Sequence, residues 1–208
     1  MQGITSDMLL NIYRQGYFPM ADNAHDEEFY IVEPKVRGLL PIRELHISRS
    51  LKKALRQQNY TIRFNENFEA VIRACQETTP TRADTWINDK IIDLFIELHD
   101  QGHAYSVEYW EGNHLKGGLY GLALGTIFCG ESMFSRASNA SKIALVHLCK
   151  ILDDTGFEML DAQFMNDHLK QFGAYEMPQD EYLKHLETKQ FKNNSLASYQ
   201  VNQEAYQT

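Results

Sequence analysis

The sequence predicts an α/β or α+β layered domain, in which helices pack on a mixed β-sheet. After residue 104 the order of segments is strand, strand, strand, helix, strand, helix, strand. Within this order, Thr126–Phe164 reads as a strand, a helix and a strand, a crossover that makes its two strands parallel. Asp89–Asp100 carries apolar residues at helical spacing and ends before Gly102, so it adds an amphipathic helix. Helices of this kind bury their apolar side against a sheet, which predicts layers.

Two further helices are expected in the first sixty residues. One spans Ser6–Gly16, with Ser6 or Asp7 as its cap. The other begins near Ser48, because a serine side chain accepts a hydrogen bond from the first turn of a helix. Four basic residues of this second helix share one face: Arg49, Lys52, Lys53 and Arg56. On the pattern alone, a solvated helix face is the ordinary interpretation of this cluster.

The remaining elements follow from alternation, helical spacing and turn residues. Predicted strands span 60–63, 104–110, 114–125, 126–134, 157–164 and 175–178. Predicted helices span 67–75, 141–156 and 166–174. Ser138 or Asn139 is expected to cap the second of these helices, and Gly112 lies in a predicted hairpin turn.

We expect the chain to have three parts. Residues 1–33 form a small N-terminal segment, 34–188 form the main domain, and 189–208 form a polar, loosely held tail. A chain of 208 residues can bury a core without disulfide bonds. Its three cysteines are odd in number and lack CxxC spacing, which favours a reducing compartment and argues against a structural zinc site.

Charge and hydropathy narrow the class of protein. The net charge of −8 argues against non-specific binding along nucleic acid, although it leaves room for a local basic patch. No signal peptide is recognisable, and no segment reaches the roughly 20 apolar residues of a membrane-spanning helix. No HExxH or other metal-binding spacing of histidines occurs, so no metal is expected. The sequence therefore predicts a soluble, cytoplasmic protein.

The two strands of the predicted crossover carry three candidate catalytic residues, two acids and one amide. Side chains alternate along a strand, so Glu131 and Met133 are expected to share a face of the first strand of the crossover. Asp161 and Gln163 are likewise expected to share a face of the second strand. If the two strands are neighbours, Glu131, Asp161 and Gln163 meet at one end of the sheet, where such sheets bind ligands. The structural alternative is that each acid caps a helix or pairs with Arg136.

The turn at 136–141 resembles acetyl-CoA-dependent N-acetyltransferases in its layout of strand, turn and helix. Those enzymes bind the pyrophosphate with backbone N–H groups of a glycine-containing turn at the start of a helix. This turn contains no glycine, so the layout is present without the usual anion-binding loop.

The chain resembles the bacterial leucyl/phenylalanyl-tRNA–protein transferases from about residue 6 to 187. The resemblance is carried by YRQGYFPMA (13–21), HISRSLKK (46–53), TWI (85–87), GHAYSVEYW (102–110), GGLYGLALGTIFCGESMFSRASNASKIAL (117–145) and LDAQFMNDHLKQFGA (160–174). It implies an acetyltransferase-like (GNAT-like) mixed sheet with helices on both faces, preceded by a small N-terminal segment. It also implies transfer of Leu or Phe from aminoacyl-tRNA to proteins that begin with Arg or Lys, which creates a degradation signal.

The resemblance further implies roles for the candidate residues. Gln163 would hydrogen-bond the attacking amine, Asp161 would polarise that amide, and Glu131 would hold the amine or the basic side chain of the acceptor. The ribose hydroxyl of the tRNA could carry the proton instead, because an amide is a poor base. No cofactor is implied.

The substrate sites implied by the resemblance take three forms. An apolar pocket for the aminoacyl side chain would be lined by Gly130, Met133, Leu119, Leu148, Leu152 and Leu160. The tRNA end would contact Trp86, Phe95, Met20, Tyr13 and Phe18, although Met20 and Phe95 replace a tryptophan and a tyrosine that are common in the family. The basic cluster at Arg49, Lys52, Lys53 and Arg56 would meet tRNA phosphates. A monomer is expected, and the alternatives are an acetyl-CoA-dependent N-acetyltransferase and an inactive tRNA-binding adaptor.

Overall fold

The longest strands form from the apolar, glycine-containing stretch between residues 104 and 135. In the computed structural model, which describes residues 4–57, 59–78, 85–192, 196–203 and 205–206, this stretch makes β5 (Ala104–Glu111), β6 (His114–Leu124) and β7 (Ile127–Ser135). Strand β6 pairs antiparallel with β5 on one side and with β7 on the other. Gly112 adopts a φ of +55°, a conformation open to glycine without strain, and the predicted hairpin turn is confirmed.

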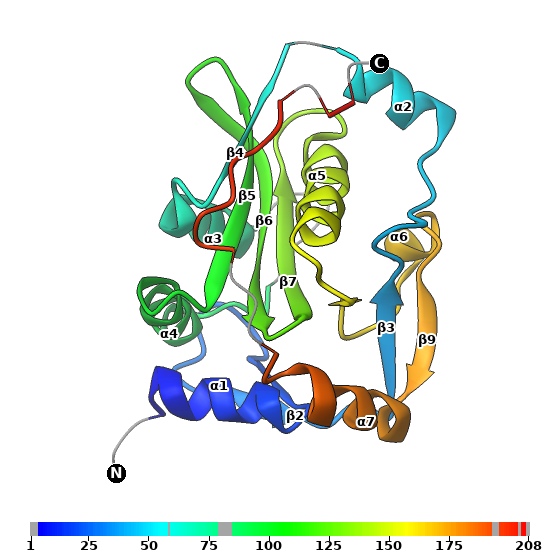
Figure 1. Ribbon diagram of the computed structural model, residues 1–208. Helices are drawn as coiled ribbons and strands as arrows, with labels where there is room; N and C mark the ends of the chain where they lie inside the picture. The colour runs from blue at the N-terminus through cyan, green and yellow to red at the C-terminus, as the bar shows by residue number, and fades with distance from the viewer. Residues whose placement is uncertain (1–3, 58, 79–84, 193–195, 204, 207–208) are drawn as a thin grey trace.

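Seven strands join in one mixed sheet in the order β4-β5-β6-β7-β8-β3-β9 (Figure 1). The added strands are β4 (Thr61–Phe64), β8 (Met159–Asp161), β3 (Val36–Leu40) and β9 (Tyr175–Pro178). The β7–β8 pair is parallel and is joined by α5 (Ala140–Asp154), so the predicted crossover is confirmed. The sequence did not predict β3, which lies between β8 and β9 and pairs antiparallel with both.

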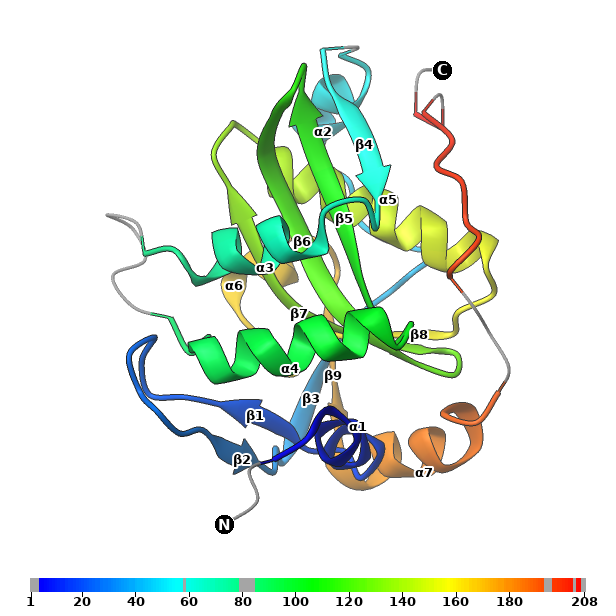
Figure 2. The same ribbon diagram turned by 90° about the vertical axis from the view of Figure 1, so that its left-hand side faces the viewer.

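Helices cover both faces of the sheet, and a separate apolar core lies between the helices and the sheet on each face. On one face lie α1 (Ser6–Arg14), α3 (Phe68–Gln76), α4 (Asp89–Asp100) and α7 (Gln179–Lys189), with α3 and α4 in front of the sheet in Figure 2. On the other lie α5, α2 (Arg49–Leu55) and α6 (Asp167–Lys170). The two-stranded sheet of β1 (Phe18–Met20) and β2 (Tyr30–Val32) stands apart from the main sheet. Neither this hairpin nor α7 was predicted, because each is short or polar.

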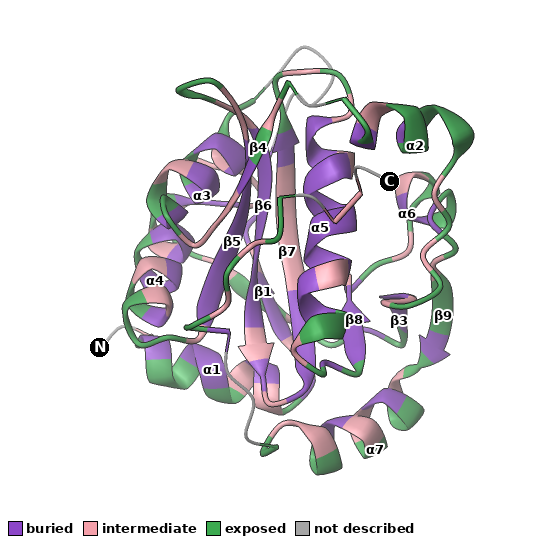
Figure 3. Cartoon of the chain, turned by 45° about the horizontal axis from the view of Figure 1, so that its top comes forward, coloured by how far each residue is buried: buried purple, intermediate pink, exposed green. Residues whose placement is uncertain are grey.

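The expectation of a loosely held tail is wrong at three of its residues: Leu196, Gln203 and Tyr206. Leu196 is buried in the same apolar core as α5, and the Tyr206 hydroxyl donates to the carbonyl of Val146 in α5 at 3.3 Å. The Gln203 side chain bonds to both backbone groups of Ile62, accepting from its N–H at 3.0 Å. Because β4 is an edge strand, a side-chain amide satisfies groups that no neighbouring strand meets. The tail also explains why α5 is buried almost all round (Figure 3).

The helix caps agree with the sequence in part. Ser48 caps α2 as predicted, accepting from the N–H of Leu51 at 3.3 Å. Helix α1 is capped by Thr5 rather than by Ser6 or Asp7. Asn139 precedes α5, but it has a φ of +62° and its side chain makes no capping bond. The hydroxyl of Ser135 instead accepts from an N–H in the first turn of α5, at 3.4 Å.

Candidate active site

Glu131 occupies a β-bulge in β7. Across the β6–β7 pair, Tyr120 faces Ser132 and Gly121 faces Gly130, which leaves Glu131 as the extra residue. The bulge interrupts the alternation of side chains, so Met133 packs with the α5-side core while Glu131 lies next to Tyr13 of the opposite core. The prediction that Glu131 and Met133 share a face is therefore wrong, since it assumed an uninterrupted strand.

Asp161 ends β8 and is completely buried. Its carboxylate pairs with Arg37, which is 1% exposed and donates to both oxygens. The Tyr182 hydroxyl donates to Oδ2 at 2.9 Å and the main-chain N–H of Gln163 donates to Oδ1 at 2.9 Å. Burial alone would lower the pKa of Arg37, but the Asp161 carboxylate outweighs it and raises that pKa. Burying an ionic group is costly unless it is paired and hydrogen-bonded, and Arg37 and Asp161 meet both conditions through each other.

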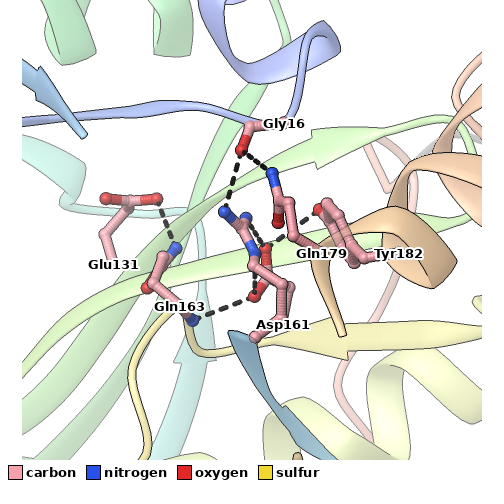
Figure 4. A network of polar contacts seen from close by, with 7 residues as sticks. Gly16, Glu131, Asp161, Gln163, Gln179 and Tyr182 are labelled. Carbon is pink, nitrogen blue, oxygen red and sulfur yellow. Dashed lines mark hydrogen bonds and ion pairs between the residues drawn. The ribbon is translucent and has the colours of Figure 1, made fainter. Parts of the chain in front are cut away.

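Gln163 links this buried pair to Glu131 (Figure 4). Its side-chain amide donates to Glu131 Oε1 at 3.1 Å, whereas Asp161 contacts only its main-chain N–H. The structure thus brings Glu131, Asp161 and Gln163 together, but places Glu131 rather than Asp161 on the side-chain amide. The structural alternative of a pair with Arg136 is wrong, because Arg136 pairs with Glu77 at 2.6 Å.

The electrostatic setting of Glu131 favours its neutral form. Burial raises the pKa of Glu131 to about 8; the Tyr13 hydroxyl and Arg37 oppose that rise, and the Asp161 charge adds to it. The Tyr13 hydroxyl acts on this carboxyl electrostatically, although the buried oxygen has no hydrogen-bond partner of standard geometry. A cation that approached Glu131 would favour the ionised carboxylate.

A cavity of about 220 Å³ opens beside Glu131, between β7 and β8. Five of the six residues predicted for the aminoacyl pocket line it: Leu119, Gly130, Met133, Leu148 and Leu160. The sixth, Leu152, is completely buried in the core and does not reach the cavity wall. Pockets for drug-sized ligands measure roughly 300–1,000 Å³, so this cavity suits a single side chain.

The cavity has polar wall residues that the sequence did not indicate. Asn166 and His168 line it, at the start of α6. Asn166 also caps that helix, accepting from the N–H of Leu169 at 2.9 Å. In the sequence, Asn166 is recognisable only as a residue that precedes a short helix. That position predicts a helix cap and does not predict a cavity wall.

The residues predicted for the tRNA end differ in exposure. Trp86 and Met20 are partly exposed, and the N–H of Ala21 donates to the carbonyl of Trp86 at 3.2 Å, which brings the two segments together. Tyr13, Phe18 and Phe95 are buried. Phe95 meets Tyr13 at a centroid distance of 6.2 Å and is completely buried, so its ring has no exposed face on which an adenine could stack.

The predicted basic cluster lies on and just after α2, at an edge of the molecule (Figures 1 and 3), and none of its residues lines the cavity. Arg49, Lys52, Lys53 and Arg56 are all exposed. The apolar side of the helix, with Leu51 and Leu55, is buried against α5. The four cations are therefore free to face solvent or an anionic partner.

Sequence reasoning missed Arg37 in this network and gave Tyr182 no role. Arg37 is a single cation within the apolar run VRGLL of β3, and a cation in a buried strand requires a buried acid as its partner. That signal was present, but only the tertiary structure identifies Asp161 as the partner.

Two searches of the described residues were negative. No three His, Cys, Asp or Glu side chains among them are grouped closely enough to hold a metal ion. Within the same part of the chain, every helix falls short of the length and apolar content that crossing a bilayer requires.

Comparisons with known proteins agree on one family. The family profile described as "Leucyl/phenylalanyl-tRNA protein transferase" matches residues 39–187. A protein of that name from Paramagnetospirillum magneticum is 48% identical over 206 residues, covering 97% of this chain and 99% of its own. Another from Maricaulis maris is 47% identical over 186 residues, covering 89% and 86%. Among solved structures, a functionally unknown conserved protein from Staphylococcus epidermidis matches with a TM-score of 0.42 and 9% identity, covering 85% of this chain and 66% of its own.

Proposed function

Because the chain belongs to the leucyl/phenylalanyl-tRNA–protein transferase family, we propose that it moves leucine or phenylalanine from aminoacyl-tRNA to the N-terminal amine of a protein. The acceptors in this proposal begin with Arg or Lys, and the product carries a degradation signal at its N-terminus. The observation that supports the proposal best is the hydrogen bond from Gln163 to Glu131, a residue that lines the apolar cavity.

The reaction is an aminolysis of an activated ester. The amine nitrogen bonds to the carbonyl carbon, the ester C–O bond breaks, and the ribose oxygen leaves with a proton from the amine. Since the ester is already reactive, holding the amine against the carbonyl can supply most of the acceleration. The protein then needs groups that hold the acceptor near the ester and groups that bind an apolar side chain, and the site contains both.

Glu131 is suited to bind the acceptor. Glu131 lines the cavity, and its carboxyl carries a pKa of about 8, because burial disfavours the charge. An incoming ammonium or guanidinium group would restore the charge of the carboxylate and gain a charge-assisted hydrogen bond. The amide of Gln163, held on the same carboxyl, is placed to hydrogen-bond the amine.

The apolar cavity would take the side chain of the transferred amino acid. Leucines from β6, β8 and α5 and Met133 of β7 form its wall. Such a pocket rejects charged side chains, but it discriminates weakly among apolar ones, since one methylene is worth only about 1–3 kcal/mol. This matches transfer of both Leu and Phe.

The tRNA would contact two separate regions. Trp86 and Met20 are the predicted tRNA-end residues with exposed surface, so they are proposed to pack on the terminal adenosine, with Tyr13, Phe18 and Phe95 supporting them from beneath. The cations of α2 would meet phosphates, which gives weak, salt-dependent binding.

We further propose an acetyltransferase-like (GNAT-like) fold for residues 34–188, with 1–33 as an N-terminal segment and a monomeric state. The parallel β7–β8 pair joined by α5, with a cavity beside it, supports the fold. The glycine-free turn before α5 supports aminoacyl-tRNA rather than acetyl-CoA as donor, and no cofactor is required.

The test supplies purified protein with radiolabelled Leu-tRNA or Phe-tRNA and a peptide that begins with Arg, without acetyl-CoA. Label should enter this peptide and not a control peptide that begins with Ala. Bound tRNA without transfer would identify an inactive adaptor instead. Absence of both, together with acetyl transfer from acetyl-CoA, would identify an acetyltransferase.

A further inference from the structure

We propose that Arg37 is a positioning residue, which acts through Asp161 to fix the main chain of Gln163 and thereby places the Gln163 amide for transfer. The inference rests on the function proposed above and assigns Asp161 a role different from polarising that amide. It comes from the network of Figure 4, where Glu131 and Gln163 lie on one side of Asp161, and Tyr182 and Gln179 lie on the other.

The Asp161 carboxylate has no capacity left for a substrate. It accepts hydrogen bonds from four donors: Arg37 Nε and Nη2, the Tyr182 hydroxyl and the N–H of Gln163. A carboxylate has about four lone-pair sites, so these donors saturate it. Asp161 is also completely buried and is absent from the cavity wall. Its contacts are therefore those of an anchor.

Gln163 needs such an anchor. Its φ of +56° lies in the left-handed region, which a residue other than glycine adopts only when its surroundings impose it. Besides the bond to Asp161, its carbonyl accepts from the N–H of Gly38 at 2.9 Å. The carbonyl of Gly38 accepts from Ala162 at 2.8 Å. Gly38 follows Arg37 in β3, so one strand holds the conformation through both its backbone and its charge.

Gly38 also sets how closely β3 approaches this segment. A Cβ at Gly38 would lie 3.0 Å from main-chain atoms of Phe164 and Met165. The loop after Gln163 thus packs directly on the backbone of β3, and displacement of β3 would displace Gln163.

Arg37 itself is held from several directions. Its Nη1 donates to the carbonyl of Gly16 at 3.1 Å, and its guanidinium lies over the rings of Tyr182 at 4.3 Å and Phe18 at 5.2 Å. These contacts use the planar fork of arginine, which a lysine cannot reproduce. Arg37 therefore connects the N-terminal segment, β8 and α7 at a single point behind Gln163.

The test compares Arg37→Lys, which keeps the positive charge but loses the fork, with Arg73→Lys at an exposed ion pair on α3. Circular dichroism first shows that each variant is folded. Nuclear magnetic resonance of protein labelled with ¹⁵N-glutamine then follows the main-chain amide of Gln163, identified by its absence in Gln163→Ala. We expect this signal to move in Arg37→Lys and to stay in place in Arg73→Lys, without any substrate present.

Single-turnover transfer from Leu-tRNA to the Arg peptide is measured on the same variants. We expect Arg37→Lys to lower the rate by about 100-fold, the loss typical of a misplaced group, with the Kd for tRNA nearly unchanged. In a Gln163→Ala background the same change should cost no more than about twofold, because the two residues act as one unit.

Several results would overturn the inference: an unmoved Gln163 signal, a wild-type rate in Arg37→Lys, or equal losses in both backgrounds. If Arg37→Lys does not fold, Tyr182→Phe takes its place, since it keeps the ring and the ion pair and removes one hydrogen bond to Asp161. It should move the Gln163 signal and slow transfer by about two- to tenfold; no change would again overturn the inference. Failure of the wild-type protein to transfer would count against the proposed function alone, because the amide signal tests the positioning independently.

Discussion

The elevated pKa of Glu131 predicts that this one carboxyl makes the stability of the protein depend on pH. The perturbation is Glu131→Gln, which keeps an oxygen to accept from Gln163 and removes the titration. In the folded protein the pKa of Glu131 is about 8, against 4.5 when it is unperturbed. The folded state thus holds a proton that the unfolded state releases, so this contribution to stability is complete below pH 4.5 and is lost as the pH rises through 8.

The magnitude follows from the size of that difference. At 1.36 kcal/mol for each pH unit, the full difference corresponds to about 5 kcal/mol. Glu131 is partly exposed, and solvent screening reduces the expected effect to about 2–4 kcal/mol. Relative to Glu131→Gln, the wild-type protein should lose this much free energy of unfolding between pH 5 and pH 9.

Urea denaturation at several pH values measures the effect. Glu69→Gln is the matched control, because Glu69 is an exposed glutamate on α3 whose ion pair contributes little. Its difference from the wild-type protein should be nearly independent of pH. A constant difference between Glu131→Gln and wild type from pH 5 to pH 9 would show that burial does not control this carboxyl, and the electrostatic argument for Glu131 would then be wrong.

Three further predictions concern transfer and folding. Gln163→Ala should lower the single-turnover rate strongly while the circular dichroism spectrum stays native; transfer at the wild-type rate would remove Gln163 from the mechanism. Arg49→Ala with Lys53→Ala should raise the KM for tRNA more than it lowers kcat, and should reduce the salt dependence of tRNA binding by a slope of about 2 in a log–log plot. Gly121→Ala should lower the free energy of unfolding by about 1–3 kcal/mol in urea titrations, because the new Cβ would lie 2.3 Å from the carbonyl oxygen of Cys129 beside the bulge; unchanged stability would mean that the bulge adapts.

The fold was predictable where a pattern is long. Helix α4 was predicted with its observed bounds because several turns of apolar spacing end at a glycine. The crossover from β7 through α5 to β8 was predicted from its order of elements. The short strands β1, β2 and β3 carry too few residues to show a period, and α7 is too polar to show an apolar stripe, so these elements were missed.

The candidate site was predictable in its residue types and not in its contacts. Glu131, Asp161 and Gln163 do lie together, since the carboxyl ends of parallel neighbours meet. Their order of contact was not predictable, because the bulge at Glu131 and the left-handed φ of Gln163 both break the regular strand geometry from which the prediction was made. Their roles in transfer remain predictions.

The sequence by itself determined the family, the layered fold and the strand order around the crossover, because these depend on local spacing and on a long run of matched residues. The tertiary structure decided that Arg37 pairs with Asp161, that Asp161 holds the main chain of Gln163, and that Glu131 hydrogen-bonds the Gln163 side chain and lines the cavity. These contacts join residues as many as 124 positions apart in the chain. No local pattern records such a distance, and a buried charge finds its partner only when the chain has folded.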